Sequence, residues 1–360
     1  MGKNYYIIPI FVPHFGCPHD CVFCNQRRIT GISTNVTPAY VRKTIDEYLA
    51  TFPKKDITVE VAFYGGSFTG IPMDIQRELL KVPLEYKNKG LINAIRLSTR
   101  PDYIDNDILD MLEAYKVDTI ELGVQSLNND VLINSGRGHN SEQVYMASKL
   151  IKEHNFNLGL QMMVGLPGDS REKSIYTAKE FIKLKPYCVR IYPTLVIKDT
   201  YLEKMYYKKI YKPLSLEEAI DISTDLLMLF EYHDINVIRV GLQPTKNINF
   251  GKDVIAGPFH PSFRQLVESN KYRILLESFL DGFRDNYVGM DFIINVNQKC
   301  LSNLVGQRSS NIKHLKEKYK FKNIKVLRKD LPKDILQLSI GDILLNLDIK
   351  SLIGEYIINL

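Results

Sequence analysis

Three of the five cysteines in this 360-residue chain lie within eight residues of one another. They are Cys17, Cys21 and Cys24, with the spacing C-x3-C-x2-C. Gly16 and Pro18 disfavour a regular helix here, so the sequence predicts a loop whose three thiolates bind one metal ion or cluster. Three thiolates suit a four-iron, four-sulfur (4Fe-4S) cluster in which one iron has no protein ligand and can bind a small molecule.

Two other uses of these cysteines compete with the cluster. Zinc could be held by the three thiolates together with His14 or His19, but structural zinc sites more often have two C-x2-C pairs. Disulfides would leave one cysteine over and would need an oxidising compartment. The remaining cysteines, Cys188 and Cys300, are too few for a second cluster, so we expect one cluster only.

Composition is that of a soluble globular protein, with 45% apolar and 24% charged residues, and the length suits one large domain and a small one. No run is long and apolar enough for a signal peptide or a membrane span, which makes the cytoplasm the expected compartment. Charge is uneven: from Lys299 to Lys333 eleven basic residues face two acidic ones, a balance of 11 − 2 = +9 in a chain of net +6. This segment suggests a polyanionic partner. A lysine-rich surface that faces only solvent would have the same composition.

Apolar strand-like runs alternate with helical patterns over the first two-thirds of the chain. The expected strands are near-continuously apolar, as strands buried on both faces should be, and cover 5–12, 58–64, 94–98, 119–124, 157–164 and 188–194. Helices are expected between them, one opening at Thr37-Pro38 and a later one at the capping box Ser215–Glu218. Six such repeats predict parallel strands with right-handed crossovers, closing as a partial (β/α)6 TIM barrel.

Unusual residues recur where each expected strand ends. The cysteine loop follows the first strand, and the other ends carry Gly65-Gly66-Ser67, Ser98-Thr99-Arg100, Gly123-Val124-Gln125, Gly165-Leu166-Pro167 and Tyr192-Pro193-Thr194. A single glycine or proline at a strand end usually does no more than form a turn. Six clusters on one rim instead predict a functional site, because parallel barrels keep their chemistry at the carboxyl ends of the strands.

The cysteine spacing, with an aromatic before the last cysteine, resembles the radical S-adenosylmethionine (SAM) enzymes. The resemblance implies that the open iron binds SAM, which one electron cleaves to a 5'-deoxyadenosyl radical. It also implies that Gly65, Gly66 and Ser67 contact the methionine amine of SAM. Ser98 would contact the ribose hydroxyls, and Phe23 would pack near the adenine or simply plug the loop.

Three further positions are similar to the coproporphyrinogen-oxidase-like branch of these enzymes. Gln125 and Arg137 match its glutamine and arginine, and the resemblance implies that Arg137 pairs with the SAM carboxylate. Gln161 matches a SAM-binding position that is usually acidic in that branch.

Longer phrases resemble the radical SAM core of the elongator catalytic-subunit family over roughly residues 5–245. They are Thr99–Asp102, Glu121–Ser126, Arg137–His139, Met162–Gly168 and Ile191–Ile197. That family modifies the wobble uridine of tRNA with an acetyl group from a separate acetyltransferase domain. About 115 residues follow the core here, so we expect no such domain and leave the reaction open.

The last third has the order strand, helix, Gly-x-x loop, helix, strand, strand, which resembles a minimal KH RNA-binding module. Gly306, Gln307 and Arg308 would form its backbone-clamping loop, with Lys313 and Lys316 on the following helix. Ser309 stands where a second glycine is usual. A small α/β cap without a ligand is the alternative.

These patterns predict a barrel domain at 1–245, a helical connector at 246–290 and a small α/β domain at 291–360. We expect a radical SAM enzyme that modifies RNA, either tRNA or rRNA, with an electron donor such as flavodoxin or ferredoxin; the oligomeric state is left open. The alternatives are a radical SAM enzyme for a small molecule or tetrapyrrole, and a non-enzymatic metal-containing RNA-binding protein.

Overall fold

The structure is a computed structural model that describes residues 4–12, 21–25, 36–53, 56–242, 248–283, 286–358 and 360. Its contacts divide the chain into two compact units. The barrel unit comprises Met1–Pro213 and Gln243–Phe259, and the C-terminal unit comprises Leu214–Leu242 and His260–Leu360. Residues 214–242, which the sequence-based boundaries assign to the barrel domain, thus cluster with the C-terminal unit.

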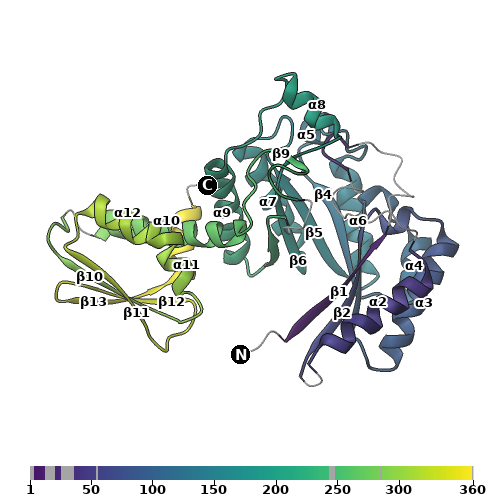
Figure 1. Ribbon diagram of the computed structural model, residues 1–360, viewed down its shortest axis with the longest axis horizontal. Coiled ribbons are helices and arrows are strands. Elements are labelled where there is room, and N and C mark those ends of the chain that lie inside the picture. The colour runs from purple at the N-terminus through teal and green to yellow at the C-terminus, as the bar shows by residue number, and fades with distance from the viewer. Residues whose placement is uncertain are drawn as a thin grey trace. The chain divides into compact units, whose positions relative to one another are not determined.

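Parallel strands form the sheet of the barrel unit, in the order of their sequence (Figure 1). The strands that the barrel unit contributes to this seven-stranded sheet are β1 Tyr5–Val12, β2 Thr58–Gly65, β3 Ala94–Thr99, β4 Thr119–Gln125, β5 Asn157–Val164 and β6 Cys188–Pro193. The longer helices between them are α2 Pro38–Thr51, α3 Met73–Asn88, α4 Asn106–Ala114, α6 Ser141–Glu153 and α7 Arg171–Leu184. This alternation confirms the expected α/β partial barrel, with every predicted strand in place to within one residue.

Shorter elements lie mostly near the carboxyl ends of the strands. They are η1 Phe68–Gly70, η2 Pro101–Tyr103, α5 Asn129–Asn134, β7 Val196–Ile197, α8 Tyr201–Tyr207 and β9 Val254–Ala256. β7 pairs with β9 in an antiparallel ribbon. Figure 1 shows this ribbon beside α8 and α5, at one end of the parallel strands.

The two faces of the barrel sheet differ in chemistry. One face is aliphatic and fully buried, with residues such as Ile10, Val61 and Ile120. The alternate positions carry polar or charged side chains, among them Glu60 and Glu121, both about 1% exposed. Side chains of a strand alternate between faces, so the sheet turns its apolar face to the helices and its polar face to the barrel interior.

Local signals explain where the helices begin. The Thr37 side chain accepts a hydrogen bond from the backbone N–H of Tyr40 at 3.2 Å, and Pro38 occupies the first turn of α2. The capping box predicted at Ser215 and Glu218 is present and opens α9, Leu216–Tyr232.

The C-terminal unit contains a mixed four-stranded sheet with helices on one side. Besides α9 its elements are β8 Asn236–Val240, α10 Phe263–Phe283, β10 Asp291–Val296, α11 Leu301–Val305, η3 Gln307–Ser309, α12 Ser310–Tyr319, β11 Asn323–Arg328, β12 Ile335–Ile340, β13 Ile343–Asp348 and α13 Ile349–Ile357. The strand order is β11-β10-β12-β13, with β10 and β11 parallel and the other pairs antiparallel. Its core joins Phe292, Ile294 and Leu338 of the sheet to Leu275 and Leu276 of α10.

None of the described helices is long and apolar enough to cross a membrane.

Candidate active site

Two of the three clustered cysteines lie in the described part of the loop after β1. Cys21 is buried and Cys24 is half-buried, and the Cys24 N–H donates to the Cys21 carbonyl at 2.9 Å. Val22 N–H donates to the Ser135 carbonyl at 3.0 Å, which fixes the loop to the end of α5. Cys17, His14 and His19 lie outside the described residues, so the three-thiolate ligand set and its zinc alternative stay predictions.

Two arginines approach the Cys21 sulfur. Arg137 Nη1 lies 3.3 Å from Sγ and Arg100 Nη1 lies 3.9 Å from it. Both guanidinium groups are almost fully buried. They place positive charge beside the position where a thiolate-ligated cluster would bring negative charge.

Arg100 is itself held by a bidentate pair with Asp102, at 2.9 Å and 3.0 Å. Burial of Asp102 opposes its ionisation, but the Arg100 guanidinium outweighs this and lowers the pKa of the Asp102 carboxyl. Arg100 also donates to the backbone carbonyl of Arg137, so the two arginines are oriented together.

Gln125 ends β4 in a strained conformation. Its φ is +71°, which is uncommon for a residue with a side chain, and the register with β5 shifts between Gly123 and Gln125. The Gln125 Oε1 and Arg137 Nε atoms are buried without a hydrogen-bond partner among the described residues. Both side chains border the space at Gly123, where a polar ligand would give these two atoms partners.

Gly123 keeps the space between these side chains open. A Cβ at Gly123 would lie 3.2 Å from Gln125 Nε2 and 3.5 Å from Arg137 Nη2. The Arg137 Nη2 group also donates to the Gly123 carbonyl. An alanine here would therefore press on both groups that the ligand would use.

His139 is buried behind the arginines. Its Nε2 lies 3.2 Å from the Val124 carbonyl, which makes Nε2 the protonated nitrogen, and its Nδ1 lies 4.0 Å from Asp102 Oδ1. Burial, and then the charges of Arg137 and Arg100, lower the pKa of His139 to about 3. The imidazole is therefore neutral near pH 7 and adds no further positive charge to the site.

The glycine turn after β2 lies against the end of β1. Gly65 has φ +100°, and a Cβ there would lie 2.6 Å from the Val12 carbonyl oxygen. The Gly66 N–H donates to that same oxygen at 3.1 Å. Only glycine permits this approach, so the turn is fixed at the strand end that leads into the cysteine loop; Ser67 follows it, half-buried.

A buried ionic network fills the neighbouring part of the barrel interior. Glu121 of β4 accepts from Arg190 Nε at 2.6 Å and from Arg96 Nη1 at 2.7 Å. Arg96 Nε also donates to Glu60 at 2.9 Å. Although burial opposes its charge, the two arginines hold the pKa of Glu121 below its usual value.

The network reaches two of the predicted SAM positions. Gln161 Nε2 donates to Glu121 Oε2 at 2.8 Å and lies 3.3 Å from Ser98 Oγ. Tyr64, just before the glycine turn, accepts from Arg190 Nη2 at 2.8 Å. The strand ends thus bring Ser98 and Gln161 together, and the carboxylate next to Gln161 comes from Glu121.

Phe23 takes part in an apolar cluster above the loop. It packs on Val22, Val196, Leu202 and Tyr211, the last three contributed by β7 and the α8 region. Phe23 is half-buried against this cluster, and its contact with adenine stays a prediction.

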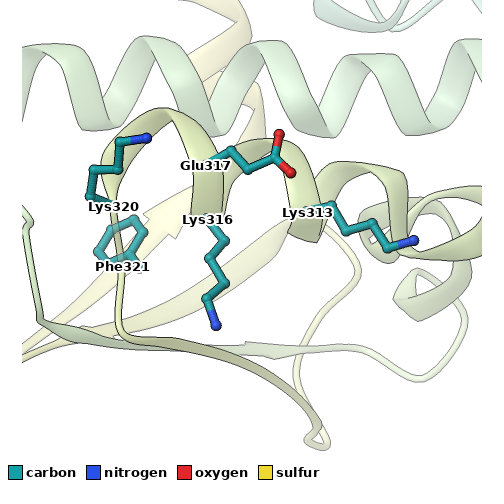
Figure 2. Close-up of a pocket in the computed structure, with 5 residues that line it drawn as sticks. All are labelled: Lys313, Lys316, Glu317, Lys320 and Phe321. Carbon is teal, nitrogen blue, oxygen red and sulfur yellow. The ribbon is translucent and has the colours of Figure 1, made fainter.

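The predicted RNA-binding residues lie on the C-terminal unit, within one segment. The loop between α11 and α12 has positive φ at Gly306 (+76°), Arg308 (+52°) and Ser309 (+60°). Lys313, Lys316 and Lys320 are exposed on or just after α12 and line a surface hollow of about 470 Å³ with Glu317 and Phe321. Figure 2 shows the three ammonium groups spread apart, an arrangement that suits a row of phosphates more than one anion.

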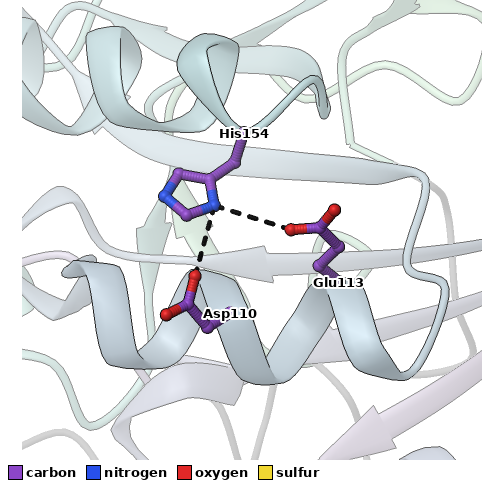
Figure 3. A group of neighbouring side chains, drawn as sticks. All are labelled: Asp110, Glu113 and His154. Atoms are coloured by element: carbon purple, nitrogen blue, oxygen red, sulfur yellow. Dashed lines mark ion pairs between the residues drawn. The ribbon is translucent and has the colours of Figure 1, made fainter.

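A second group of titratable residues lies away from the strand carboxyl ends. His154 Nδ1 is 3.6 Å from Asp110 and 3.8 Å from Glu113 (Figure 3). His154 ends α6 just before β5, so this group sits at the amino end of the barrel strands, where residues serve stability more than chemistry. Both carboxylates are about 70% exposed, and we assign the group as surface ion pairs.

Comparison with known families agrees with this geometry. The Radical SAM superfamily matches residues 11–180, and the Radical_SAM C-terminal domain matches residues 186–273. An uncharacterized protein of Methanocaldococcus jannaschii is 30% identical over 222 residues, which cover 59% of this chain and 68% of that protein. The chain belongs to the radical SAM superfamily.

Other relatives carry a named activity. The tRNA uridine(34) acetyltransferase of Methanocaldococcus infernus is 28% identical over 258 residues, and Elongator complex protein 3 of Bos taurus is 26% identical over 262. Each match covers 60% of this radical SAM chain but only 48% of the relative, so the chain spans about half the length of these proteins. This radical SAM enzyme is thus a distant homologue of tRNA uridine(34) modifying enzymes.

A solved structure supports the fold. The archaeal Methanocaldococcus infernus Elp3 with an N-terminal deletion matches with a TM-score of 0.59 at 20% identity, over 95% of this radical SAM chain and 76% of that one. The expected radical SAM partial barrel with a C-terminal α/β region is therefore confirmed.

Sequence reasoning missed several residues of this site. Arg100 and His139 stand out in the sequence only within phrases that resemble the elongator family, and no pattern predicts a role for Tyr64, Glu121 or Arg190. The available signal was charge at alternate positions of otherwise apolar strands, as at Glu60, Arg96 and Arg190, because such positions share one face.

Proposed function

We propose that Cys17, Cys21 and Cys24 hold one 4Fe-4S cluster and that SAM binds beside it at the strand ends. The observation that carries this proposal is Arg137, whose Nη1 lies 3.3 Å from the Cys21 sulfur and whose Nε is buried without a hydrogen-bond partner among the described residues, as is Oε1 of Gln125 across Gly123. The chemistry that these groups supply when bound is reductive cleavage of SAM to a 5'-deoxyadenosyl radical.

The chain's own residues would divide the binding of SAM among them. Arg137, fixed by Gly123 and Arg100, would pair with the carboxylate of SAM in a charge-assisted contact. Gly65, Gly66 and Ser67 would present backbone carbonyls to its amine, from a turn that the close approach of Gly65 to Val12 holds in place. Ser98, already beside Gln161, would reach the ribose hydroxyls.

Cysteine variants test the cluster. We expect Cys24→Ala to lose the visible absorbance of the iron–sulfur cluster, most of its iron, and the release of 5'-deoxyadenosine from SAM after anaerobic reduction. Cys188→Ala is the matched control, because this buried thiol lies in β6 against Arg96, away from the loop. Zinc in anaerobically purified protein, or SAM cleavage by Cys24→Ala at the wild-type rate, would overturn the assignment.

A Gln125 variant separates SAM binding from cluster binding. Gln125→Ala should keep the iron content and the absorbance of the wild type but bind SAM about 10-fold more weakly, the loss expected for one hydrogen bond to a charged ligand. Equilibrium binding of SAM to the reconstituted protein gives this number directly.

We propose RNA, and tRNA first, as the substrate. Two features support it: the named relatives act on tRNA uridine(34), and the segment from Lys299 to Lys333 carries a charge of +9. The C-terminal unit supports it further, since β10 and β11 pair in parallel around two helices joined by the Gly306–Ser309 loop, the order of a KH-like module. Gly306, Gln307 and Arg308 would clamp the RNA backbone, with Lys313 and Lys316 on the phosphates.

Nucleoside mass spectrometry tests the substrate. RNA from cells with and without the gene should differ by one modified nucleoside, in the tRNA fraction before the rRNA fraction. A flavodoxin or ferredoxin would supply the electron in the reconstituted reaction. Identical nucleosides in both RNA samples, together with absent RNA binding at low salt, would favour a small-molecule or tetrapyrrole substrate instead.

A further inference from the structure

A short helical segment beside the cysteine loop exposes aromatic and basic side chains together. We call the exposed residues of Tyr201–Lys212 the α8 surface: Tyr201, Lys204, Tyr207, Lys208, Lys209, Ile210 and Lys212. We propose that the α8 surface docks single-stranded RNA at the mouth of the barrel. The proposal rests on the RNA function proposed above and adds the place where the substrate meets the site.

The segment is attached directly to the loop that carries the cysteines. Leu202 N–H donates to the Val22 carbonyl at 2.7 Å, and Asn25 Nδ2 donates to the Lys198 carbonyl at 3.3 Å. Val22 lies next to Cys21 and Asn25 next to Cys24. RNA bound on the α8 surface would therefore lie close in space to the loop that carries Cys21 and Cys24.

The inner side of the segment anchors it firmly. Leu202 and Tyr211 are buried in the apolar cluster with Val22 and Val196. The Tyr211 hydroxyl donates to the Gly165 carbonyl, just after β5, at 2.6 Å. The exposed residues are thus presented from a fixed base at the carboxyl end of the barrel.

Large apolar side chains stand among the exposed lysines of the segment. Tyr201 is 60% exposed, Tyr207 is 65% exposed and Ile210 is 69% exposed. Three such side chains within ten residues give the segment several apolar contacts to offer a partner. Tyrosine rings stack on unpaired bases of any sequence, whereas bases within a duplex offer no free face.

The charges of the segment fit a polyanion. Lys204, Lys208, Lys209 and Lys212 have no ion-pair partner within the part of the chain that the structure describes. From Lys198 to Lys212 there are five lysines against two acidic residues, a balance of 5 − 2 = +3. One of those acids, Glu203, already accepts from the Asp199 N–H at 2.8 Å. Unpaired lysines between tyrosines are the combination that holds phosphates while bases stack.

Two double variants of the 360-residue, cluster-loaded chain test the docking surface. The probes are a labelled single-stranded oligouridylate and unfractionated tRNA. Tyr201→Ala with Tyr207→Ala should weaken oligouridylate binding by about 30-fold or more, from at least ~1 kcal/mol per lost stacking contact. Lys208→Gln with Lys209→Gln should lower the salt slope of log K by about 1.4, from ~0.7 per phosphate contact to a single strand.

Matched controls remove residues of the same types elsewhere on the barrel unit. Tyr187 is 54% exposed at the other end of β6, and Lys149 sits on α6 with Glu153 as its partner. Tyr187→Ala and Lys149→Gln should leave oligouridylate affinity within two-fold of the wild type. Iron content, measured on every sample, reports whether the cysteine loop is intact.

The outcomes separate this proposal from the one on which it rests. If the wild type binds neither probe at low salt, the RNA function fails. If the wild type binds and both double variants bind equally well, RNA docks elsewhere and the α8 surface is wrong. Photo-crosslinking of a 4-thiouridine oligonucleotide decides the case in which the tyrosine variant loses iron: adducts within residues 201–212 support the proposal, and adducts only on the C-terminal unit overturn it.

Discussion

Glu121 and Lys316 represent opposite uses of charge in the two units of this molecule. Glu121 lies in the barrel interior, 1% exposed, and contacts two arginines and a glutamine. Lys316 stands on α12 of the C-terminal unit, exposed to solvent beside Lys313 and Lys320. Partners surround the charge of Glu121, whereas Lys313, Lys316 and Lys320 form a row of exposed lysines with Glu317 beside them.

The difference shows what each kind of charge can do. Removing a charge from water costs several kcal/mol per ion, so a buried network persists only where partners of defined geometry offset that cost. Such a network holds side chains in fixed positions, as the Gln161–Ser98 contact requires. An exposed lysine costs little and fixes nothing, but a row of them attracts a polyanion.

The α8 surface combines the two uses. It belongs to the barrel unit and is anchored by the buried Tyr211, yet its lysines are exposed like those of α12. We therefore expect the α8 surface to bind RNA, and the buried ionic network of Glu121, Arg96 and Arg190 to position the side chains of the site.

The largest expected effect is on the buried side of this comparison. Glu121→Gln should lower the free energy of unfolding by about 3–5 kcal/mol, because Arg96 and Arg190 would then stay buried with too little negative charge nearby. Lys316→Gln should change it by less than about 0.5 kcal/mol. Urea unfolding followed by circular dichroism measures both, and equal losses would contradict the distinction between the two units.

A glycine pair tests how tightly the site is built. Gly65→Ala should cost about 2–4 kcal/mol, since it adds a left-handed φ penalty to a Cβ that would meet the Val12 oxygen. Gly90→Ala has a left-handed φ of +69° and open space around its Cβ, so it should cost only about 1 kcal/mol. The difference between the two unfolding free energies reports the close approach together with the wider φ at Gly65, and equal costs would show that the Gly65 turn can relax.

Acid should weaken the barrel unit through His139. The folded-state pKa of His139, about 3, is below the usual value of 6.5, so the unfolded chain takes up a proton first and stability falls as the pH drops below about 6.5. The loss should be about 1.4 kcal/mol between pH 7.5 and pH 5.5. His139→Gln should flatten this part of the profile, while Asp102, whose pKa is lowered, keeps a further loss at more acidic pH. An unchanged profile in His139→Gln would show that other groups carry it.

Local patterns in the sequence predict most of the fold. The strands are short apolar runs, the helices begin at caps such as Thr37 and Ser215, and the cysteine spacing needs no tertiary information. β13 and α13 were not predicted, although Gly341-Asp342 between two apolar runs is a signal for a two-residue hairpin. The observed β12–β13 pairing closes around those two residues.

The interior of the site depends on register, which the sequence does not display. Arg100 and Cys21 are 79 positions apart, and Arg190 and Glu121 are 69 apart. Their contacts follow from how neighbouring strands align and from the bulge at Gln125. A one-residue change of register would move each charge to the helix-covered face, so no local pattern could have paired them.

The smallest expected effect on stability is that of replacing the exposed lysines of the C-terminal unit, a change that should nevertheless strongly alter tRNA binding. Replacing Lys313, Lys316 and Lys320 with glutamine should leave the unfolding free energy within about 0.5 kcal/mol of the wild type, because none of the three is buried. The same variant should lower the salt slope of tRNA binding by about 2, from ~0.7 per phosphate contact to unpaired RNA. Lys318→Gln is the control, since Lys318 points to the other side of α12 and pairs with Glu277 and Asp281. If Lys318→Gln lowers the slope as much per lysine as the triple variant does, the C-terminal unit attracts RNA by net charge alone, and the row of exposed lysines has no special place in it.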